Sequence, residues 1–518
     1  MHDAGIDPTD DLSTAAPAPT VIRPLPNGLA IALVTGTSGA VLVLEILAGR
    51  LLAPYVGVNL ETYTAIIGTI LAGIALGAWA GGAAADRVDP RALIPLLLVT
   101  GGALAIASIP IVRALGGDAG ADGIGAPSVL LALWGFGPSA AVLSAVPPAV
   151  VKLQLRNLER TGTTVGRLSA WGTGGAIAGT FLAGYVLVAY AAVTTLIVTV
   201  GGLLMVAGAA FWIADRLAPP GLMMSAGGIA ALAIVGVAAT DDPCDFQSSY
   251  YCIAIEDDPG RTRGRFLILD DLRHSYVDLD DPTYLHFWYV RRITEAIDAF
   301  APPGEIDAVT IGAGAMTIPQ WIRATRDGSE QVVLELDGDL VAVIDDELPP
   351  AGGGTFADAA DIEVVVGDGR RTIRELPDDS TDVVVGDAFG SRAVPWHLTT
   401  REFMDEIGRV LRPGGIYVVN VIDGGGESFL RAKTATMRSV MPHVAVLRGP
   451  GVVDGRIGNS VVVASSEPFD PGRWEAELER TGEDGVLVDD VDAYLADAIV
   501  LTDDFAPVDQ LIAGVGRS

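Results

Sequence analysis

Seven apolar runs fill the first half of this chain and constrain its fold more than any other feature. Each has about the 20 residues that an α-helix needs to cross a bilayer. The sequence of 518 residues is 50% hydrophobic, which is more than ordinary soluble domains carry. We therefore predict a seven-helix transmembrane domain at residues 28–240, in contact with the lipid bilayer, after a polar tail at residues 1–27. The runs are Leu29–Leu52, Tyr63–Ala85, Leu93–Leu115, Val129–Val151, Ala170–Tyr190, Val193–Ile213 and Leu222–Ala239.

The acidic residues are concentrated in the second half. Twelve of the 64 Asp and Glu residues lie before Thr240, so the net charge of -31 belongs mainly to the residues that follow. An acidic surface of this kind repels nucleic acid, and we exclude a nucleic-acid partner on that ground. We interpret the charge as a halophile-like surface, whose self-repulsion is screened by salt.

Basic residues in the loops predict how the bundle is oriented. They follow the second, fourth and sixth runs, and positive loops favour the cytoplasm. With seven spans, this bias predicts a multi-pass protein of the cell membrane, with its N-terminus inside and everything after Ala239 on the outer face. The first run has no cleavage-site pattern close behind it, so we expect a retained helix. The basic residues are Arg87, Arg91, Lys152, Arg156, Arg160, Arg167 and Arg216.

Two kinds of residue within the runs carry separate information. Gly73, Gly77 and Gly81 repeat every four residues, which predicts close packing of one helix face against a neighbour. Glu45 and Arg50 are ionisable groups at membrane depth, where charge is costly and usually faces a partner or a wet cavity. They could pair with each other or line a cavity, and Arg50 could also reach the membrane surface.

The two cysteines of the chain, Cys244 and Cys252, follow the last apolar run closely. An exclusive close pair in an oxidising compartment predicts a disulfide. Two free thiols remain the alternative. We expect no metal site from two cysteines alone.

The second half alternates apolar, β-rich runs with helical patterns such as 342–347 and 400–411. This alternation predicts a mostly parallel sheet flanked by helices at residues 283–518, preceded by a small β element at residues 241–282. In open sheets of this kind, ligands bind at the carboxyl ends of the strands. The expected strands are Ala308–Ile311, Val332–Leu334, Ile362–Val366, Val383–Val385 and Ile416–Val421.

Acidic residues and glycines follow these strands in order. Gly312 and Gly314, in IGAGAMT, would let the backbone approach a ligand closely. Glu335 ends the next strand, where an acid commonly accepts hydrogen bonds from ribose hydroxyls. Asp368, beside Gly369, could accept the amino group of an adenine, and Asp387 ends the fourth strand. Each acid alone could be a solvated turn or cap, but together they favour a nucleoside site.

The order GAG, ELD, GDG and VVVGDAF, followed by LRPGGIYVVN, resembles the spermidine synthase family of aminopropyltransferases. The upstream LDDLRHSYVDLDDPTYLHFWY looks like the small β domain of that family. A membrane-fused branch of the family also shows E-x4-R in its first span, GAWAGG, and a closing TDDFAPVD. The resemblance implies a Rossmann-like fold of the class I methyltransferase type.

The resemblance also implies an activity. Members of the family transfer an aminopropyl group from decarboxylated S-adenosylmethionine to an amine by direct displacement at carbon. Carried over, Gly312, Gly314 and Gly369 would bind this donor or a related nucleoside, together with Glu335 and Asp368, without a metal. Asp387 would be the catalytic carboxylate that helps to deprotonate and orient the nucleophile.

The chain departs from the family where the amine would bind. Acids typical of soluble members are replaced by Ala315 and Gly390, YHE reads LHF at Leu285–Phe287, and a glutamine becomes His274. A dicationic amine would lose several charge-assisted bonds in such a pocket.

Histidines and aromatic residues stand in their place. We predict His397 and His286 as catalytic bases beside Asp387, because histidine titrates near neutral pH. His274, Tyr284 and Trp396 would bind the substrate. The alternative is that His397 caps the following helix and Trp396 packs against the membrane domain.

Four functions follow from these residues. The first is a membrane-embedded aminopropyl-type transferase acting on a small amine. The second is an outward-facing enzyme that moves an alkyl group between membrane lipid and an acceptor such as a lipoprotein cysteine. A methyltransferase that uses S-adenosylmethionine and a non-catalytic binding platform are the other two, and a homodimer is an open alternative.

Overall fold

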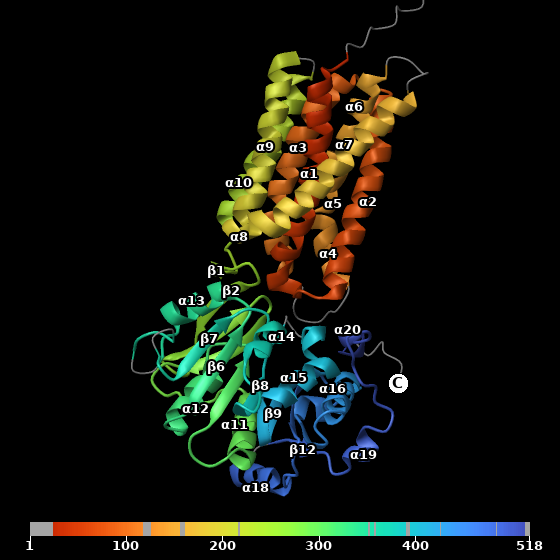
Figure 1. The fold of residues 1–518 in the computed structure, drawn as a ribbon. Coiled ribbons are helices and arrows are strands. Elements are labelled where there is room, and N and C mark those ends of the chain that lie inside the picture. Colours follow the sequence, from red (N-terminus) through yellow and green to blue (C-terminus); the bar gives the residue numbers. More distant parts are fainter. Residues whose placement is uncertain are drawn as a thin grey trace, which may run out of the picture.

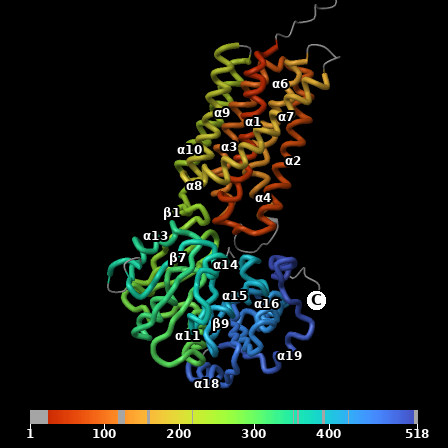
Figure 2. Tube along the Cα trace, in the orientation of Figure 1, coloured from red at the N-terminus to blue at the C-terminus, as the bar shows by residue number. Residues whose placement is uncertain are grey.

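A computed structural model gives two parts, a helical bundle and an α/β domain at one end of it (Figures 1 and 2). The residues that it describes are 24–117, 126–155, 161–215, 218–350, 353–356, 359–389, 394–424, 426–482 and 484–512.

The bundle contains six helices that are long and apolar enough to cross a membrane, judged by length and composition over the described residues. The expected fourth run is broken. It bends by 41° between Pro127–Gly135 and Gly137–Gln154, and the number of spans is seven if this pair counts as one. Pro138 follows the break directly, and proline lacks the amide hydrogen that would continue the helix. The helices are α1 (Asn27–Val56), α2 (Leu60–Ala85), α3 (Pro90–Gly116), α4 (Ala126–Gly135), α5 (Gly137–Ser144), α6 (Val146–Gln154), α7 (Thr161–Leu182), the π-turn η2 (Ala183–Leu187), α8 (Val188–Tyr190), α9 (Val193–Asp215) and α10 (Pro220–Ala239).

Ion pairs identify the two ends of the bundle. At one end, Arg91 pairs with Asp215 at 2.5 Å and donates to the carbonyl of Pro24 at 3.1 Å. At the other end, Arg113 donates to the carbonyl of Thr240 at 3.0 Å and pairs with Asp242 at 2.6 Å. The first described residues and the α/β domain therefore lie at opposite ends (Figure 1). Of the residues that carry the predicted charge bias, Arg156, Arg160 and Arg216 lie outside the described residues.

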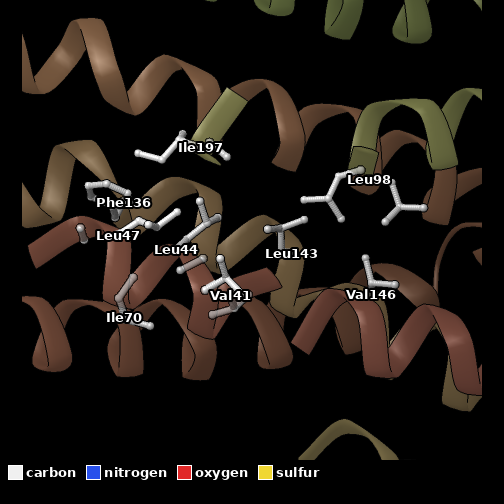
Figure 3. Close-up of a cluster of buried hydrophobic side chains, with 14 of the residues drawn as sticks. Val41, Leu44, Leu47, Ile70, Leu98, Phe136, Leu143, Val146 and Ile197 are labelled. Atoms are coloured by element: carbon white, nitrogen blue, oxygen red, sulfur yellow. The ribbon is translucent and has the colours of Figure 1, made fainter. Parts of the chain in front are cut away.

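The core of the bundle is apolar and closely packed. Figure 3 shows side chains such as Leu44, Ile70, Phe136 and Ile197 meeting from different helices, and each has at most 1% of its surface exposed. A Cβ atom at Gly77 of α2 would overlap the carbonyl of Ala141 in α5. The glycine repeat therefore lies against a neighbouring helix.

Between the two parts lies a small antiparallel sheet of four strands in the order β1-β2-β3-β4. Its strands are β1 (Phe246–Gln247), β2 (Cys252–Asp257), β3 (Gly264–Leu269) and β4 (Leu272–Asp278). A disulfide joins Cys244 to Cys252 across the turn that carries β1.

The α/β domain contains an eight-stranded sheet in the order β12-β10-β11-β9-β8-β5-β6-β7. Its parallel part, β9-β8-β5-β6-β7, confirms the mostly parallel sheet. The remaining strands pair antiparallel at the other edge. The strands are β5 (Asp307–Ile311), β6 (Glu330–Glu335), β7 (Ile362–Val366), β8 (Thr381–Gly386), β9 (Leu411–Asp423), β10 (His443–Arg448), β11 (Gly458–Ser465) and β12 (Val486–Leu487).

Helices cover both faces of this sheet, and the carboxyl ends of its parallel strands point toward the bundle (Figure 1). In Figure 1, α13 and α14, which follow β6 and β7, lie on the bundle side. The helices are α11 (Trp288–Phe300), α12 (Thr317–Thr325), α13 (Gly338–Glu347), α14 (Gly369–Thr372), η3 (Ile373–Glu375), η4 (Trp396–Leu398), α15 (Arg401–Val410), α16 (Ser428–Arg438), α17 (Pro450–Val453), α18 (Gly472–Thr481), α19 (Val491–Tyr494) and α20 (Val508–Ile512).

The glycine packing of α2 can be tested with a matched pair of variants. We expect Gly77→Val to lower the Tm of the purified protein, because the new side chain collides with α5 and overpacking costs about 1–3 kcal/mol. Gly68→Val in the same helix is the control, since nothing lies within 4 Å of its Cβ position. Thermal unfolding in detergent, followed by circular dichroism, measures both. Equal Tm values for the two variants would contradict this packing.

Candidate functional site

A cleft at the carboxyl ends of the parallel strands brings the predicted donor residues together. Residues from β4, α11 and the loops after β5, β6, β7 and β8 line it. Glu335, Asp368 and Asp387 border this one cleft, with Gly312, Gly314 and Gly369 between them. Further lining residues include Tyr251, His274, Ser275, Tyr289, Phe389 and His397.

Two glycines let the walls of the cleft approach one another. Gly312 has a φ of +94°, and a Cβ there would lie 2.6 Å from the carbonyl oxygen of Asp387. Gly314 has a φ of +50°, and a Cβ there would overlap the side chain of Ser275 in β4. Both backbone conformations favour glycine. The loop after β5 therefore serves packing as well as ligand approach.

Glu335 is held by backbone amides at the end of β6. The amide of Ala313 donates to its Oε2 at 2.7 Å, and the amide of Asp337 donates to its Oε1 at 2.9 Å. Only 5% of the residue is exposed, and burial raises the pKa of its carboxyl. Because a carboxylate oxygen can accept more than one hydrogen bond, both oxygens keep capacity for ligand hydroxyls.

Asp387 lies at the end of β8, partly accessible from the cleft. The side-chain amide of Asn420 donates to its Oδ1 at 3.1 Å, and the hydroxyl of Tyr289 donates to its Oδ2 at 3.2 Å. The amide of Asn459 donates to Asn420 at 3.0 Å and so fixes its orientation. Desolvation raises the pKa of Asp387 to about 6, against the effect of the two hydrogen bonds. A carboxyl with this pKa can exchange a proton near neutral pH.

His397 lines the cleft, but its partner differs from the prediction. Its Nε2 lies 3.0 Å from Oδ2 of Asp368, so the imidazole pairs with the predicted adenine acid instead of assisting Asp387. The reason is Arg370, whose guanidinium donates to the carbonyl of His397 at 2.8 Å and pairs with Asp503 at 2.6 Å. These contacts hold His397 beside α14. Asp368 also caps α14, accepting from the amide of Arg370 at 3.0 Å.

His286 and Tyr284 lie outside the residues that line the cleft, which corrects their predicted roles. The His286 ring stacks on Tyr276 with centroids 4.5 Å apart and meets Phe266 edge-on at 5.0 Å. Tyr284 contacts Tyr276 and lies under the guanidinium of Arg261. The His286 ring therefore packs against β3 and β4, and the Tyr284 ring packs against β4.

His274 lines the cleft, and Trp396 lies beside it. Desolvation lowers the pKa of His274 to about 4, so its imidazole is neutral at pH 7. Within the described part of the chain, its Nε2 has no hydrogen-bond partner. Trp396 is 49% exposed and meets the ring of His397 edge-on. Gly390, one of the departures from the family pattern, lies outside the described residues.

Sequence reasoning missed the two residues that hold Asp387. Asn420 ends the motif LRPGGIYVVN, and a polar residue that is 2% exposed in an apolar strand was the available signal. Tyr289 had no signal of this kind, because aromatic residues surround it in sequence. Over the residues described, no three His, Cys, Asp or Glu side chains gather as metal ligands.

The hydrogen bonds to Asp387 make a prediction about its titration. Asn420→Leu removes a donor to the carboxylate, so the pKa of Asp387 should rise above about 6. A hydrogen bond to a charged group contributes about 1.5–3 kcal/mol, which corresponds to roughly one or two pH units. Infrared difference spectra across pH measure the protonated carboxyl band, which is identified by its loss in Asp387→Asn. An unchanged or lower midpoint would contradict the assigned contact.

Comparisons with known proteins bear on the same half of the chain. A family model described as a methyltransferase domain matches residues 309–419. A probable polyamine aminopropyl transferase of Bifidobacterium longum is 28% identical over 198 residues, which cover 32% of this chain and 42% of that protein. This chain therefore matches less than half the length of that relative. The polyamine aminopropyltransferase of Chromobacterium violaceum is 25% identical over 211 residues, 40% of this chain and 75% of that protein.

Among solved structures, a probable spermidine synthase from Corynebacterium glutamicum covers 52% of this chain and 99% of its own, with 25% identity and a TM-score of 0.46. The relatives named by sequence and by structure are polyamine aminopropyltransferases and spermidine synthases. The methyltransferase-domain match supports a Rossmann-like fold for the second half of the chain, and the sequence relatives support its resemblance to the spermidine synthase family.

Proposed function

We propose that this protein is a membrane-embedded alkyl transferase of the aminopropyl type, with decarboxylated S-adenosylmethionine or a related nucleoside as donor. The observation that carries the proposal is the meeting of Glu335, Asp368 and Asp387 at one cleft. The sequence relatives, named as polyamine aminopropyltransferases, support the same chemistry.

The residues divide the work of donor binding. Glu335 accepts hydrogen bonds from the ribose hydroxyls, and its backbone anchors keep both oxygens in place before the donor arrives. Asp368 accepts the amino group of the adenine. Gly312 and Gly314 have no Cβ atoms, so the backbone of the loop after β5 can lie close to the donor. Neutral His274 offers a hydrogen bond without adding positive charge beside a cationic sulfonium.

Asp387 is the base of the transfer step. The lone pair of the acceptor forms a bond to the propyl carbon while the carbon–sulfur bond breaks. The electron pair of the carbon–sulfur bond returns to sulfur, and a neutral thioether nucleoside leaves. The acceptor proton passes to Asp387. A pKa of about 6 leaves most of the carboxyl ionised at pH 7 and ready to take it.

A second candidate differs in the acceptor. The strand ends that form the cleft point toward the bundle (Figure 1), and Leu336 and Val366 at these ends are 37% and 54% exposed. This placement favours a lipidic acceptor, or a lipoprotein cysteine, over a soluble amine. Methyl transfer is a lesser alternative because the small β-sheet upstream matches the aminopropyl branch. A product assay with putrescine and a lipid extract, each with the radiolabelled donor, separates a soluble from a lipidic acceptor.

Replacing the proposed base should stop turnover without preventing donor binding. We expect Asp387→Asn to lower kcat by at least about 100-fold, the usual contribution of a general base. In the wild type, kcat/KM should fall about tenfold per pH unit below about pH 6, because protonation removes the base. Exposed Asp405→Asn is the matched control and should keep wild-type rates. Wild-type turnover by Asp387→Asn would remove Asp387 from the mechanism, and donor binding without turnover in the wild type would favour a binding platform.

We propose that the catalytic half lies on the outer face of the cell membrane, and the charge bias of the loops and the disulfide support this orientation. We expect an impermeant thiol reagent to label Cys244 and Cys252 in intact cells only after reduction by an impermeant reductant. A cytoplasmic cysteine introduced beside Arg87 should stay unlabelled until the membrane is opened. Labelling of the pair only after lysis would place the domain inside.

A further inference from the structure

An arginine from the bundle reaches into the junction with the catalytic half. Arg50, one turn and a half before the end of α1, donates through Nη1 to the carbonyl of Tyr250 and through Nη2 to the carbonyl of Ser248, the latter at 2.9 Å. A planar guanidinium can hold two such acceptors at once, which an ammonium group does less well. The first apolar helix thus clamps the turn between β1 and β2.

The clamped turn is connected to the donor site through one side chain. Ser248 is 5% exposed, and its hydroxyl donates to Oδ2 of Asp337. The Ser248 Oγ also accepts from the amide of Tyr250 at 3.1 Å and from the amide of Tyr251 at 2.9 Å. Asp337 is 1% exposed, so the position of its carboxyl is set by this contact and by the cap that it forms on α13.

Asp337 also contacts Glu335, the residue proposed to bind the ribose. Its backbone amide donates to Oε1 of Glu335 at 2.9 Å. On the other side of the turn, Tyr251 lines the cleft and its hydroxyl donates to the carbonyl of Phe389 at 3.4 Å, in the loop that follows Asp387. The turn held by Arg50 therefore adjoins two walls of the cleft.

Electrostatics act in the same direction. Asp270 and Asp337 lie behind the turn, and desolvation raises the pKa of both carboxyls. Arg50 opposes this rise at Asp270, which accepts from the amide of Cys252 at 3.0 Å. Removal of the Arg50 guanidinium would leave the carboxyl groups of Asp270 and Asp337 beside the turn without this positive charge.

We infer that Arg50 is a positioning residue for the nucleoside cleft, acting through Ser248, Asp337 and Glu335. The inference rests on the proposed donor site and extends it into the membrane domain. On this account, the first apolar helix completes the donor site, and loss of the Arg50 clamp weakens donor binding without touching the ligand.

Arg113 provides a matched control from the same end of the bundle. It is likewise a partly buried arginine, and it binds the segment that follows α10 through Thr240 and Asp242. Among the described residues, Thr240 and Asp242 make no hydrogen bond to Asp337 or Glu335, although Asp242 accepts from the amide of Cys244 at 3.2 Å. Arg113→Gln therefore disturbs attachment of the two parts without acting on the ribose acid.

The test uses the full chain in lipid nanodiscs and 5′-methylthioadenosine as the probe, with affinity measured by calorimetry. We expect Arg50→Gln to weaken binding about tenfold, the equivalent of one charge-assisted hydrogen bond, with partial recovery in Arg50→Lys. Arg113→Gln should bind as the wild type does. In turnover, Arg50→Gln should raise the donor KM and leave kcat nearly unchanged. Hydrogen exchange should rise at residues 246–252 and 335–338.

Each outcome bears on one claim. No binding by the wild type would overturn the proposed donor site itself. Wild-type binding with unchanged affinity in Arg50→Gln, or equal losses in Arg50→Gln and Arg113→Gln, would overturn the positioning role. If Arg50→Gln does not fold, Ser248→Ala cuts the same connection at the hydroxyl and leaves the clamp in place. It should also weaken binding, and unchanged affinity in that variant would contradict the inference.

Discussion

The close approach of the β5 and β8 ends is the constraint on which the site depends. Only a residue without a Cβ can occupy position 312, because the carbonyl of Asp387 takes the space. That approach places the Asp387 carboxyl where surrounding protein desolvates it and where Asn420 and Tyr289 can hold it. Desolvation at this strand end thereby raises the pKa of Asp387 to about 6.

The two halves of the chain differ in composition, one apolar and one acidic, and hydrogen bonds at their junction connect them. At one end of the apolar bundle, Arg50 and Arg113 bind the segment that follows α10. The strand ends of the acidic half point toward the same end of the bundle (Figure 1). The disulfide between Cys244 and Cys252 closes the turn that Arg50 binds. If the donor binds at this edge, the Arg50 contacts make the bundle one of the supports of its site.

The sequence predicted those parts of the structure in which burial of a segment requires apolar residues. Parallel strands covered on both faces read as continuous apolar runs, and the glycines after β5 with the acids at the ends of β6, β7 and β8 mark the ligand edge. The partners of those acids were not predictable, because long-range contacts decide them: Arg370 draws His397 to Asp368, and ring packing takes His286 away from the cleft. Strands β10 to β12 and the bend before Pro138 were missed for a related reason, since pairing direction and helix breaks depend on neighbours in space.

A cryo-electron microscopy structure of the protein with a bound thioether nucleoside tests the central claim most directly. The account requires the ribose hydroxyls within hydrogen-bonding distance of Glu335, the adenine amino group at Asp368, and the sulfur on the side of Asp387. Density for the nucleoside elsewhere, or a cleft that stays empty at saturating ligand, would contradict it.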